Sequence, residues 1–241
     1  MRVMGLCLAL SRKAAPQALA LLCICGASGE AHAEPGGVSG VSGPSITEGE
    51  TRFEVRTAYF DGDTLDGSWN YRAIVSHSVT DWWRPALNFR ASQPAGQSAE
   101  LTSIAIENVI DFTATREWPV HFGLLAEYKF GLHGADDAID FKLLGEAESG
   151  AFTGRFNLIA TAQLDDGADW SPAYAARGMW RASEHVSFGL EAYGEPDVDA
   201  HYIGPRVAAR VGDANLALGY LAGIDDARAE GQFRVGMEFT R

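Results

Sequence analysis

The stretch Pro119-Val-His-Phe-Gly-Leu-Leu-Ala-Glu-Tyr-Lys-Phe130 decides the fold class, because its side chains alternate in character with a period of two. The intervening positions include His121, Glu127 and Lys129. An extended strand with this pattern has one apolar and one polar face. Glu127 and Lys129 carry opposite charges and lie on the same face of the strand, so we expect them to form an ion pair. The apolar positions are Val120, Phe122, Leu124, Ala126, Tyr128 and Phe130.

The same period recurs along the chain and predicts an all-β protein of about 12 antiparallel strands. Pro205 cannot donate a backbone hydrogen bond, which predicts a bulge or a later start in the strand that contains it. The expected strands lie at 50–60, 69–75, 87–91, 102–112, 119–130, 139–146, 152–164, 173–182, 185–194, 201–211, 215–224 and 232–241.

The connections between these strands alternate between acidic, glycine-rich loops and tight turns such as Ser149-Gly150 and Gly212-Asp213. An even strand number, strands near ten residues and alternating loop lengths are typical of outer-membrane β-barrels, with short periplasmic turns and longer outer loops. Aromatic residues at strand ends fit the two membrane interfaces. They are Trp82, Trp83, Trp118 and Trp180 on the short-turn side and Tyr59, Trp69 and Trp170 on the other.

A soluble exported barrel or sandwich, with apolar residues inside and charges outside, would show the same period. Alternation alone does not decide which face points outward. The loop asymmetry, the strand number and the aromatic residues at strand ends favour the membrane barrel.

The N-terminal region has the layout of a secretory signal: Arg2, Arg12 and Lys13, an apolar run over 14–26, and Ala31-His32-Ala33. We therefore predict a cleaved signal at 1–33, a flexible Gly/Ser/Pro-rich leader at 34–49 and a barrel domain at 50–241. The cysteines all lie within the signal, which excludes disulfides and thiolate sites from the exported chain. They are Cys7, Cys23 and Cys25.

A net charge of −13 argues against a nucleic-acid partner. Outer-membrane lipid, lipopolysaccharide and the barrel-assembly machinery are the partners that an outer-membrane location implies.

In a membrane barrel the polar face becomes the lumen wall. The excess of positive charge there either lines a narrow, anion-favouring passage or pairs across the lumen and plugs it. Strands 173–182, 185–194 and 201–211 carry most of the unbalanced arginines and offer only Glu191 in return. The predicted pore-lining residues are Arg177, Arg181, Arg206, Arg210, Arg155, Arg72, Arg90, Glu127, Lys129 and Glu191.

Acidic outer loops provide hard oxygen ligands, and Asp165, Asp166 and Asp169 are the candidates for a Ca²⁺ or Mg²⁺ site. The alternative is that loop acids simply keep the exposed tips soluble. No other cofactor is expected. Ser76-His77-Ser78 and His121 offer serine and histidine, but no Gly-x-Ser-x-Gly elbow accompanies them, so we expect no enzyme.

Four short runs have a recognisable pattern: Phe141-Lys-Leu-Leu-Gly-Glu, Gly154-Arg-Phe-Asn157-Leu, Gly189-Leu-Glu-Ala-Tyr-Gly194 and Ile203-Gly-Pro205. These runs resemble proteobacterial transporter-like outer-membrane barrels, related to those encoded with phenol-degradation (MetA-pathway) or copper-resistance B functions. The resemblance covers most of residues 100–240 and carries over no functional residue. One departure is that Phe239 is followed by Thr240 and Arg241, whereas such barrels usually end on an aromatic residue.

The sequence thus predicts an outer-membrane barrel for passive passage of small solutes, with anionic or aromatic solutes as the classes considered. A plugged barrel with a structural or surface-interaction role is the second hypothesis. A lipid-modifying enzyme is the third.

Overall fold

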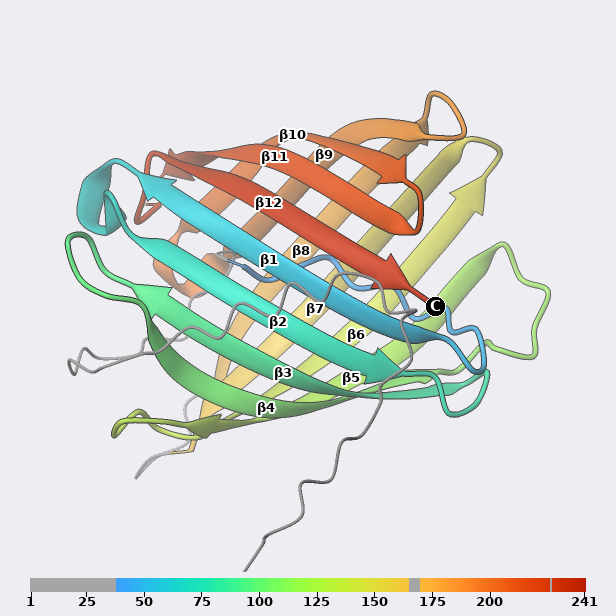
Figure 1. Ribbon diagram of the computed structural model, residues 1–241, viewed down its shortest axis with the longest axis horizontal. Coiled ribbons are helices and arrows are strands. Elements are labelled where there is room, and N and C mark those ends of the chain that lie inside the picture. The colour runs from blue at the N-terminus through green and yellow to red at the C-terminus, as the bar shows by residue number, and fades with distance from the viewer. Residues whose placement is uncertain (1–37, 165–169, 226) are drawn as a thin grey trace, which may run out of the picture.

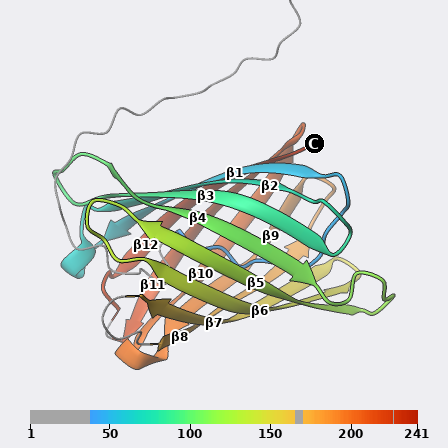
Figure 2. The ribbon, with the colours of Figure 1, turned by 90° about the horizontal axis from the view of Figure 1, so that it is seen from below.

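The computed structural model describes residues 38–164, 170–225 and 227–241, which form a closed antiparallel barrel (Figure 1). Each strand pairs with its neighbours in chain order, and β1 completes the ring by pairing with β12. Figure 2 shows the same ring from below. The elements are β1 (Thr51–Asp61), η1 (Asp63–Leu65), β2 (Trp69–His77), β3 (Trp83–Gln93), β4 (Glu100–Asp111), β5 (Val120–Gly131), β6 (Ala138–Ser149), β7 (Phe152–Gln163), β8 (Trp170–Arg181), β9 (Val186–Glu195), η2 (Pro196–Val198), β10 (Ala200–Val211), β11 (Ala214–Asp225) and β12 (Gly231–Thr240).

The closure between the first and last strands is complete. Thr51 and Arg241 exchange two backbone hydrogen bonds of 2.8 and 2.9 Å, and the pairing continues to Asp61 opposite Gly231. A closed ring leaves no strand edge with unpaired backbone groups, as a barrel in lipid requires. No helix among the described residues is long and apolar enough to cross a membrane.

Neither the bulge nor the later start expected at Pro205 is present, because β10 begins at Ala200 and keeps one register with β9 and with β11. Gly204 and Pro205 nevertheless have no paired residue on β11, so the ladder is interrupted there without a register shift. A proline has no backbone N–H to donate, which accounts for the interruption. A register shift lies between β3 and β4, where Arg90 pairs with Ser103, Ala91 pairs with Leu101 and Thr102 of β4 is the extra residue.

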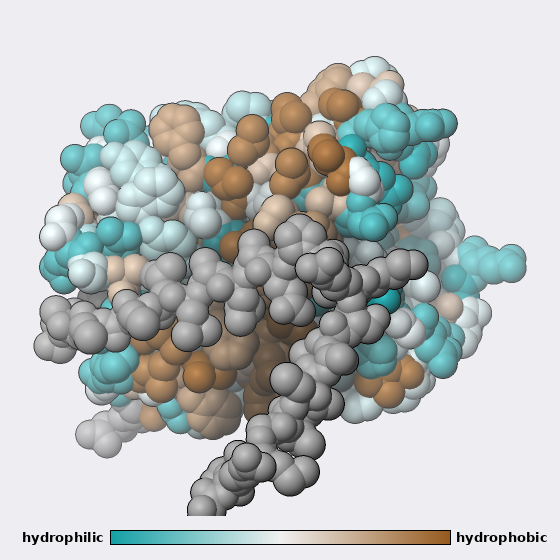
Figure 3. Space-filling view, viewed as in Figure 1, coloured by the Kyte–Doolittle hydropathy of each residue, from teal (hydrophilic) through white to brown (hydrophobic). Residues whose placement is uncertain are grey.

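The apolar side chains face outward and the charged ones inward. Phe122 and Leu143 are 50% and 57% exposed, whereas Glu127 and Asp140 on the same two strands are buried. Figure 3 shows apolar residues gathered over the middle of the visible face and polar residues towards both ends. This orientation is opposite to that of a soluble barrel and matches a lipid-facing wall.

The connections differ in length at the two ends, although less regularly than the sequence suggests. The turns at 150–151 and 212–213 are tight, and Gly150 and Gly212 both have φ of 61°, which glycine adopts without strain. The connection at 112–119, on the same end, is longer than the tight turns, and 196–199, on the other end, is short. We call the end with the connections 62–68, 94–99, 132–137, 164–169, 196–199 and 226–230 the long-loop end.

Residues 38–46 lie inside the barrel, where Figure 1 shows the blue trace between the walls, and residues 47–49 are exposed and lead into β1. The Ser42 N–H donates to Asn157 Oδ1 at 2.9 Å, and Asn157 Nδ2 donates back to the Ser42 carbonyl at 2.8 Å. Val41 is 2% exposed and packs in an apolar cluster with wall residues. We call residues 38–46 the inner segment.

This placement differs from the expectation of a flexible leader at 34–49, of which 34–37 lie outside the described residues. Glycine and serine suggest mobility in water, but they also let a backbone pass close to crowded side chains. A Cβ on Gly40 would lie 2.0 Å from Arg56 Nη1, and one on Gly43 would lie 2.4 Å from Glu146 Oε2. A side chain at either glycine would therefore displace the end of a charged side chain of the wall.

Candidate functional site

The lumen of the barrel contains the charged side chains that the sequence assigns to the polar face. They gather around two buried carboxylates, Glu127 on β5 and Glu191 on β9. The inner segment and two cavities occupy the remaining space.

Glu127 is the centre of the first cluster, and its side chain is fully buried. Arg90 Nη2 lies 2.5 Å from one carboxylate oxygen, and Arg72 Nη2 lies 3.2 Å from the other. Asn88 Nδ2 donates to Glu127 at 2.7 Å. Charged hydrogen bonds of this kind are stronger than neutral ones, so they hold three strands of the wall in a defined arrangement.

The cluster continues on both sides of Glu127. Arg72 also contacts Glu107 at 2.9 Å, and Lys129 contacts Asp140 at 2.7 Å. The expected pair between Lys129 and Glu127 is present, but at 3.9 Å it is the longer of the two lysine contacts. Because each ion has several partners on neighbouring strands, the cluster is a network rather than a set of pairs. We call Arg72, Arg90, Glu107, Glu127, Lys129 and Asp140 the Glu127 network.

Glu191 is the centre of the second cluster and is 1% exposed at its side chain. Arg206 lies 3.0 Å from it, Arg177 lies 3.4 Å from the same oxygen, and Arg234 lies 3.7 Å from the other oxygen. Three guanidinium groups thus share one carboxylate. Arg234 also places its guanidinium 4.5 Å from the centre of the Tyr193 ring, a cation–π contact.

The four arginines expected to form one pore-facing cluster occupy two places. Arg177 and Arg206 lie in the lumen and contact Glu191. Arg181 and Arg210 are exposed at the short-turn end, and Arg181 donates to the carbonyl of Gly150 at 3.3 Å. Arg177 and Arg181 are four positions apart on β8, and Arg206 and Arg210 are four positions apart on β10. Residues with this spacing face the same side of the sheet but lie at different depths of the lumen, so the four arginines do not come together.

An apolar cluster lies between the Glu191 cluster and the long-loop end. It joins the inner segment to Phe60, Tyr193, Tyr202 and Leu221 of the wall, and residues of the 226–230 connection pack into it. The hydroxyl of Tyr202 accepts the Ala229 N–H at 3.3 Å. This side of the lumen is therefore closed towards the loops.

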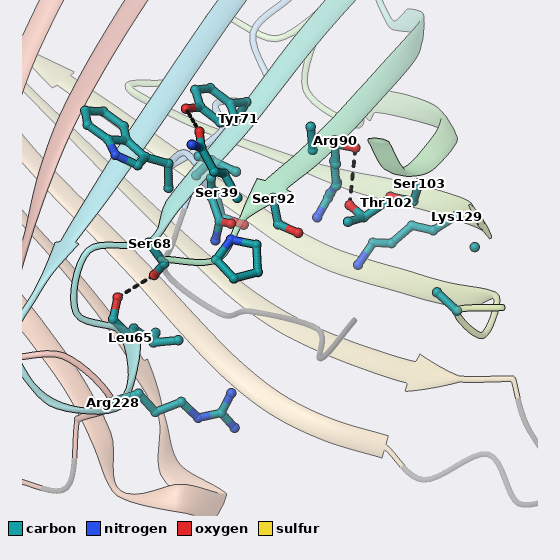
Figure 4. A pocket seen from close by; sticks show the side chains of 18 of the residues that line it. Ser39, Leu65, Ser68, Tyr71, Arg90, Ser92, Thr102, Ser103, Lys129 and Arg228 are labelled. Atoms are coloured by element: carbon teal, nitrogen blue, oxygen red, sulfur yellow. Dashed lines mark hydrogen bonds between the residues drawn. The ribbon is translucent and has the colours of Figure 1, made fainter. Parts of the chain in front are cut away.

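The other side keeps a pocket of about 330 Å³ towards the long-loop end, which we call the outer pocket (Figure 4). Arg90 and Lys129 line it from the direction of the Glu127 network, and Ser39 lines it from the inner segment. Neutral polar side chains complete the wall, among them Asn70, Ser92 and Ser103.

A second cavity of about 640 Å³ lies towards the short-turn end, and we call it the inner cavity. Arg72 and Glu107 line it from the Glu127 network, and Arg177 and Arg206 line it from the Glu191 cluster. Arg155 lines it too and pairs with Glu146, whose other oxygen accepts the Ser45 hydroxyl of the inner segment. The Glu127 network thus separates the two cavities.

The 132–137 connection beside the outer pocket is held by Asp137. The Tyr128 hydroxyl donates to Asp137 Oδ2 at 2.6 Å, and the Gly131 N–H donates to Oδ1 at 2.9 Å. These hydrogen bonds lower the pKa of the Asp137 carboxyl below its ordinary value. The carboxylate is therefore ionised at neutral pH and keeps this loop against the strand end.

The remaining sequence candidates either lie outside the described residues or are not brought together with one another. Asp165, Asp166 and Asp169 lie outside the described residues, and the described part of the chain contains no group of three possible metal ligands. His77 is on the outer face and contacts Thr51 at 3.0 Å, while His121 contacts Thr113 at 3.2 Å. Within the described ranges no serine is hydrogen-bonded to a histidine, so no activated nucleophile of that kind is formed there.

Sequence reasoning missed the inner segment as part of the lumen site. It also did not group Arg234 of β12 with Glu191, because their pairing depends on the distance between β9 and β12, which alternation does not report. The inner segment had one signal that could have been used. Val38, Val41 and Ile46 recur within the Gly/Ser stretch, and apolar residues in a leader indicate contact with a surface.

Comparisons with known proteins agree on the fold. No family model and no curated protein matches the sequence. Among solved structures, the NanC porin superposes with a TM-score of 0.60 at 10% identity, over 78% of this chain and 98% of that one. The KdgM porin, in complex with disordered oligogalacturonate, gives 0.61 at 9% identity over the same shares.

The COG4313 outer membrane channel from Pseudomonas putida F1 gives a TM-score of 0.56 at 13% identity, over 82% of this chain and 96% of that one. At identities this low, the superpositions establish a shared barrel fold and nothing finer. The resemblance to phenol-degradation and copper-resistance barrels remains a prediction.

Proposed function

We propose that this chain is an outer-membrane channel for the passive passage of small solutes, with anions favoured over cations. The observation that carries the proposal is the reversed barrel: an apolar outer wall without a free strand edge encloses charged, cavity-containing space. An apolar exterior is unstable in water, and a closed barrel is the β-structure that lipid accepts. The similar solved barrels include two porins and a channel, which supports this assignment.

Preference for anions rests on the Glu191 cluster. Arg177, Arg206 and Arg234 surround a single carboxylate, and the first two line the inner cavity. A local excess of positive charge in a narrow, poorly solvated passage raises the concentration of anions there.

A barrel with 12 strands encloses a narrow lumen, and the inner segment occupies part of it. This observation favours a second function, a plugged barrel with a structural role. The two functions differ in one property, because a plugged barrel admits no solute at all.

Solute flux into proteoliposomes tests the proposal. Purified protein should admit a small neutral solute, admit an anion of similar size faster, and admit a cation of that size more slowly. The Arg206→Gln variant should reduce the difference between anion and cation. Liposomes that contain correctly folded protein and swell no faster than empty ones would support the plugged barrel instead.

A further inference from the structure

In the outer pocket, hydrogen-bonding groups without a partner in the described chain lie beside the cations of Arg90 and Lys129. A non-selective pore does not require such an arrangement. We propose that the outer pocket binds a small carboxylate that carries several hydroxyl groups, with its carboxylate on Arg90 and Lys129. The inference deepens the proposed channel function by naming the class of solute that the long-loop end receives.

The charges around the pocket favour a monoanion. The charged side chains that line the pocket are three cations, those of Arg90, Lys129 and Arg228, and two carboxylates, those of Asp66 and Asp136. One positive charge of the lining is therefore not balanced within it. A bound carboxylate would neutralise it at the point where the network meets the pocket.

Arg90 has donors to spare for such a ligand. Its Nη2 donates to Glu127, whereas its Nη1 has no acceptor in the described chain. Figure 4 shows Arg90 and Lys129 in the wall of the pocket, and both side chains approach the same oxygen of Glu127, at 2.5 and 3.9 Å. A guanidinium and an ammonium in this arrangement can hold the two oxygens of one carboxylate.

Arg90 lies opposite a bulge of β4, because Arg90 pairs with Ser103, Ala91 pairs with Leu101 and Thr102 is the extra residue. The Thr102 hydroxyl donates to the Arg90 carbonyl at 3.2 Å and ties the bulge to β3 (Figure 4). Bulges are frequent beside binding sites. The irregularity thus accompanies the residue that the proposal assigns to the carboxylate.

Neutral groups around the two cations suit hydroxyls. The side chains of Asn70, Ser92 and Ser103 line the pocket, and none of them has a hydrogen-bond partner within the described residues. An amide and two hydroxyls provide both donors and acceptors, as a hydroxylated ligand requires. A volume of about 330 Å³ lies at the lower end of the range for small-molecule sites.

Two carboxylates, of Asp66 and Asp136, lie at the rim and oppose an anion there. Asp66 already accepts the Gly62 N–H at 3.0 Å. Arg228 of the 226–230 connection also lines the pocket, so its loop side carries charges of both signs, whereas the side formed by Arg90 and Lys129 is cationic. This difference directs the charged end of the ligand to Arg90 and Lys129.

Isothermal titration of the purified exported chain in detergent tests the site, with gluconate as the probe. Glucose lacks the charge and hexanoate lacks the hydroxyls, and both match gluconate in carbon number. Gluconate should bind at least about tenfold more tightly than either, because charged and neutral hydrogen bonds both contribute. Equal binding of gluconate and hexanoate would overturn the proposal.

Two variants localise the binding. Arg90→Gln should weaken gluconate binding at least about tenfold, since it removes a charged hydrogen bond. Ser103→Asp leaves every member of the Glu127 network in place and should weaken binding by a similar factor through repulsion. Arg181→Gln, at the exposed short-turn end, is the control and should leave binding unchanged. Full binding by a folded Ser103→Asp variant would also overturn the proposal.

Failure of this proposal is distinct from failure of the channel function. Titration needs no membrane, so binding without flux would retain the outer pocket in a plugged barrel. Flux without gluconate binding would retain the channel and remove the site.

Discussion

Glu127 and Glu191 are both buried carboxylates surrounded by cations, yet their neighbourhoods differ. Around Glu127, further acids share the cations, and the network borders an open pocket on the long-loop side. Around Glu191, three arginines depend on one acid, and an apolar cluster closes the lumen on that side. The comparison indicates that the Glu127 side receives solute, while the Glu191 side supplies the positive field and depends on a single residue.

Replacing Glu191 should have the largest effect. Glu191→Gln removes the one carboxylate that Arg177, Arg206 and Arg234 share, so the barrel should lose about 3 kcal/mol or more of unfolding free energy. Glu127→Gln is the matched control and should lose less, about 1–2 kcal/mol, because Glu107 and Asp140 remain. Urea unfolding in liposomes measures both values. Equal losses would remove the distinction between the two clusters.

Deleting residues 39–46 should raise the conductance severalfold. The deletion removes the Ser42 contacts with Asn157 and the apolar side chain of Val41 from the lumen, while all strand pairs remain. Single-channel recording measures the change. In a control variant, these residues are replaced by an equal number of alternating Gly and Ser. This variant shows whether the conductance depends on the length of the segment or on its side chains. An unchanged conductance in the deletion would mean that the inner segment does not narrow the path.

Replacing Arg206 should shift ion selectivity without closing the passage. Arg206→Gln leaves Arg177 and Arg234 on Glu191, so the cluster persists with less positive charge towards the inner cavity. The reversal potential across a salt gradient should move towards that of a cation-preferring channel. No shift would contradict the assignment of the positive field to the Glu191 side.

Replacing Arg181 and Arg210 together should have the smallest effect. Both side chains are exposed at the short-turn end, where salt screens their charge. Arg181→Gln with Arg210→Gln should therefore leave the reversal potential close to that of the unmodified chain at physiological salt. A shift as large as that of Arg206→Gln would place the selective region at the mouth.

Much of the fold could be predicted from the sequence, because a period of two reports strand and face together. The alternation over 119–130 places Glu127 and Lys129 inside and Phe122 outside, as observed. It does not report distances between strands, so the contact of Lys129 with Asp140 and that of Arg90 with Glu127 appear only in the closed barrel.

The inner segment shows a second limit of sequence reasoning. Its Gly/Ser composition describes the freedom of an isolated chain, but Ser42 and Val41 are held by partners far away in sequence. Only the lumen supplies those partners. The composition therefore indicated that the backbone of this segment can adopt many conformations, but it did not indicate that the segment lies in the lumen.

Single-channel recording from the unmodified exported chain in a planar bilayer tests the central claim most directly. The account predicts stable, small conductance steps with a reversal potential that favours anions. The account would be contradicted if protein that migrates as a folded barrel gave no conductance, both unmodified and after deletion of residues 39–46. That result would assign the barrel a structural role.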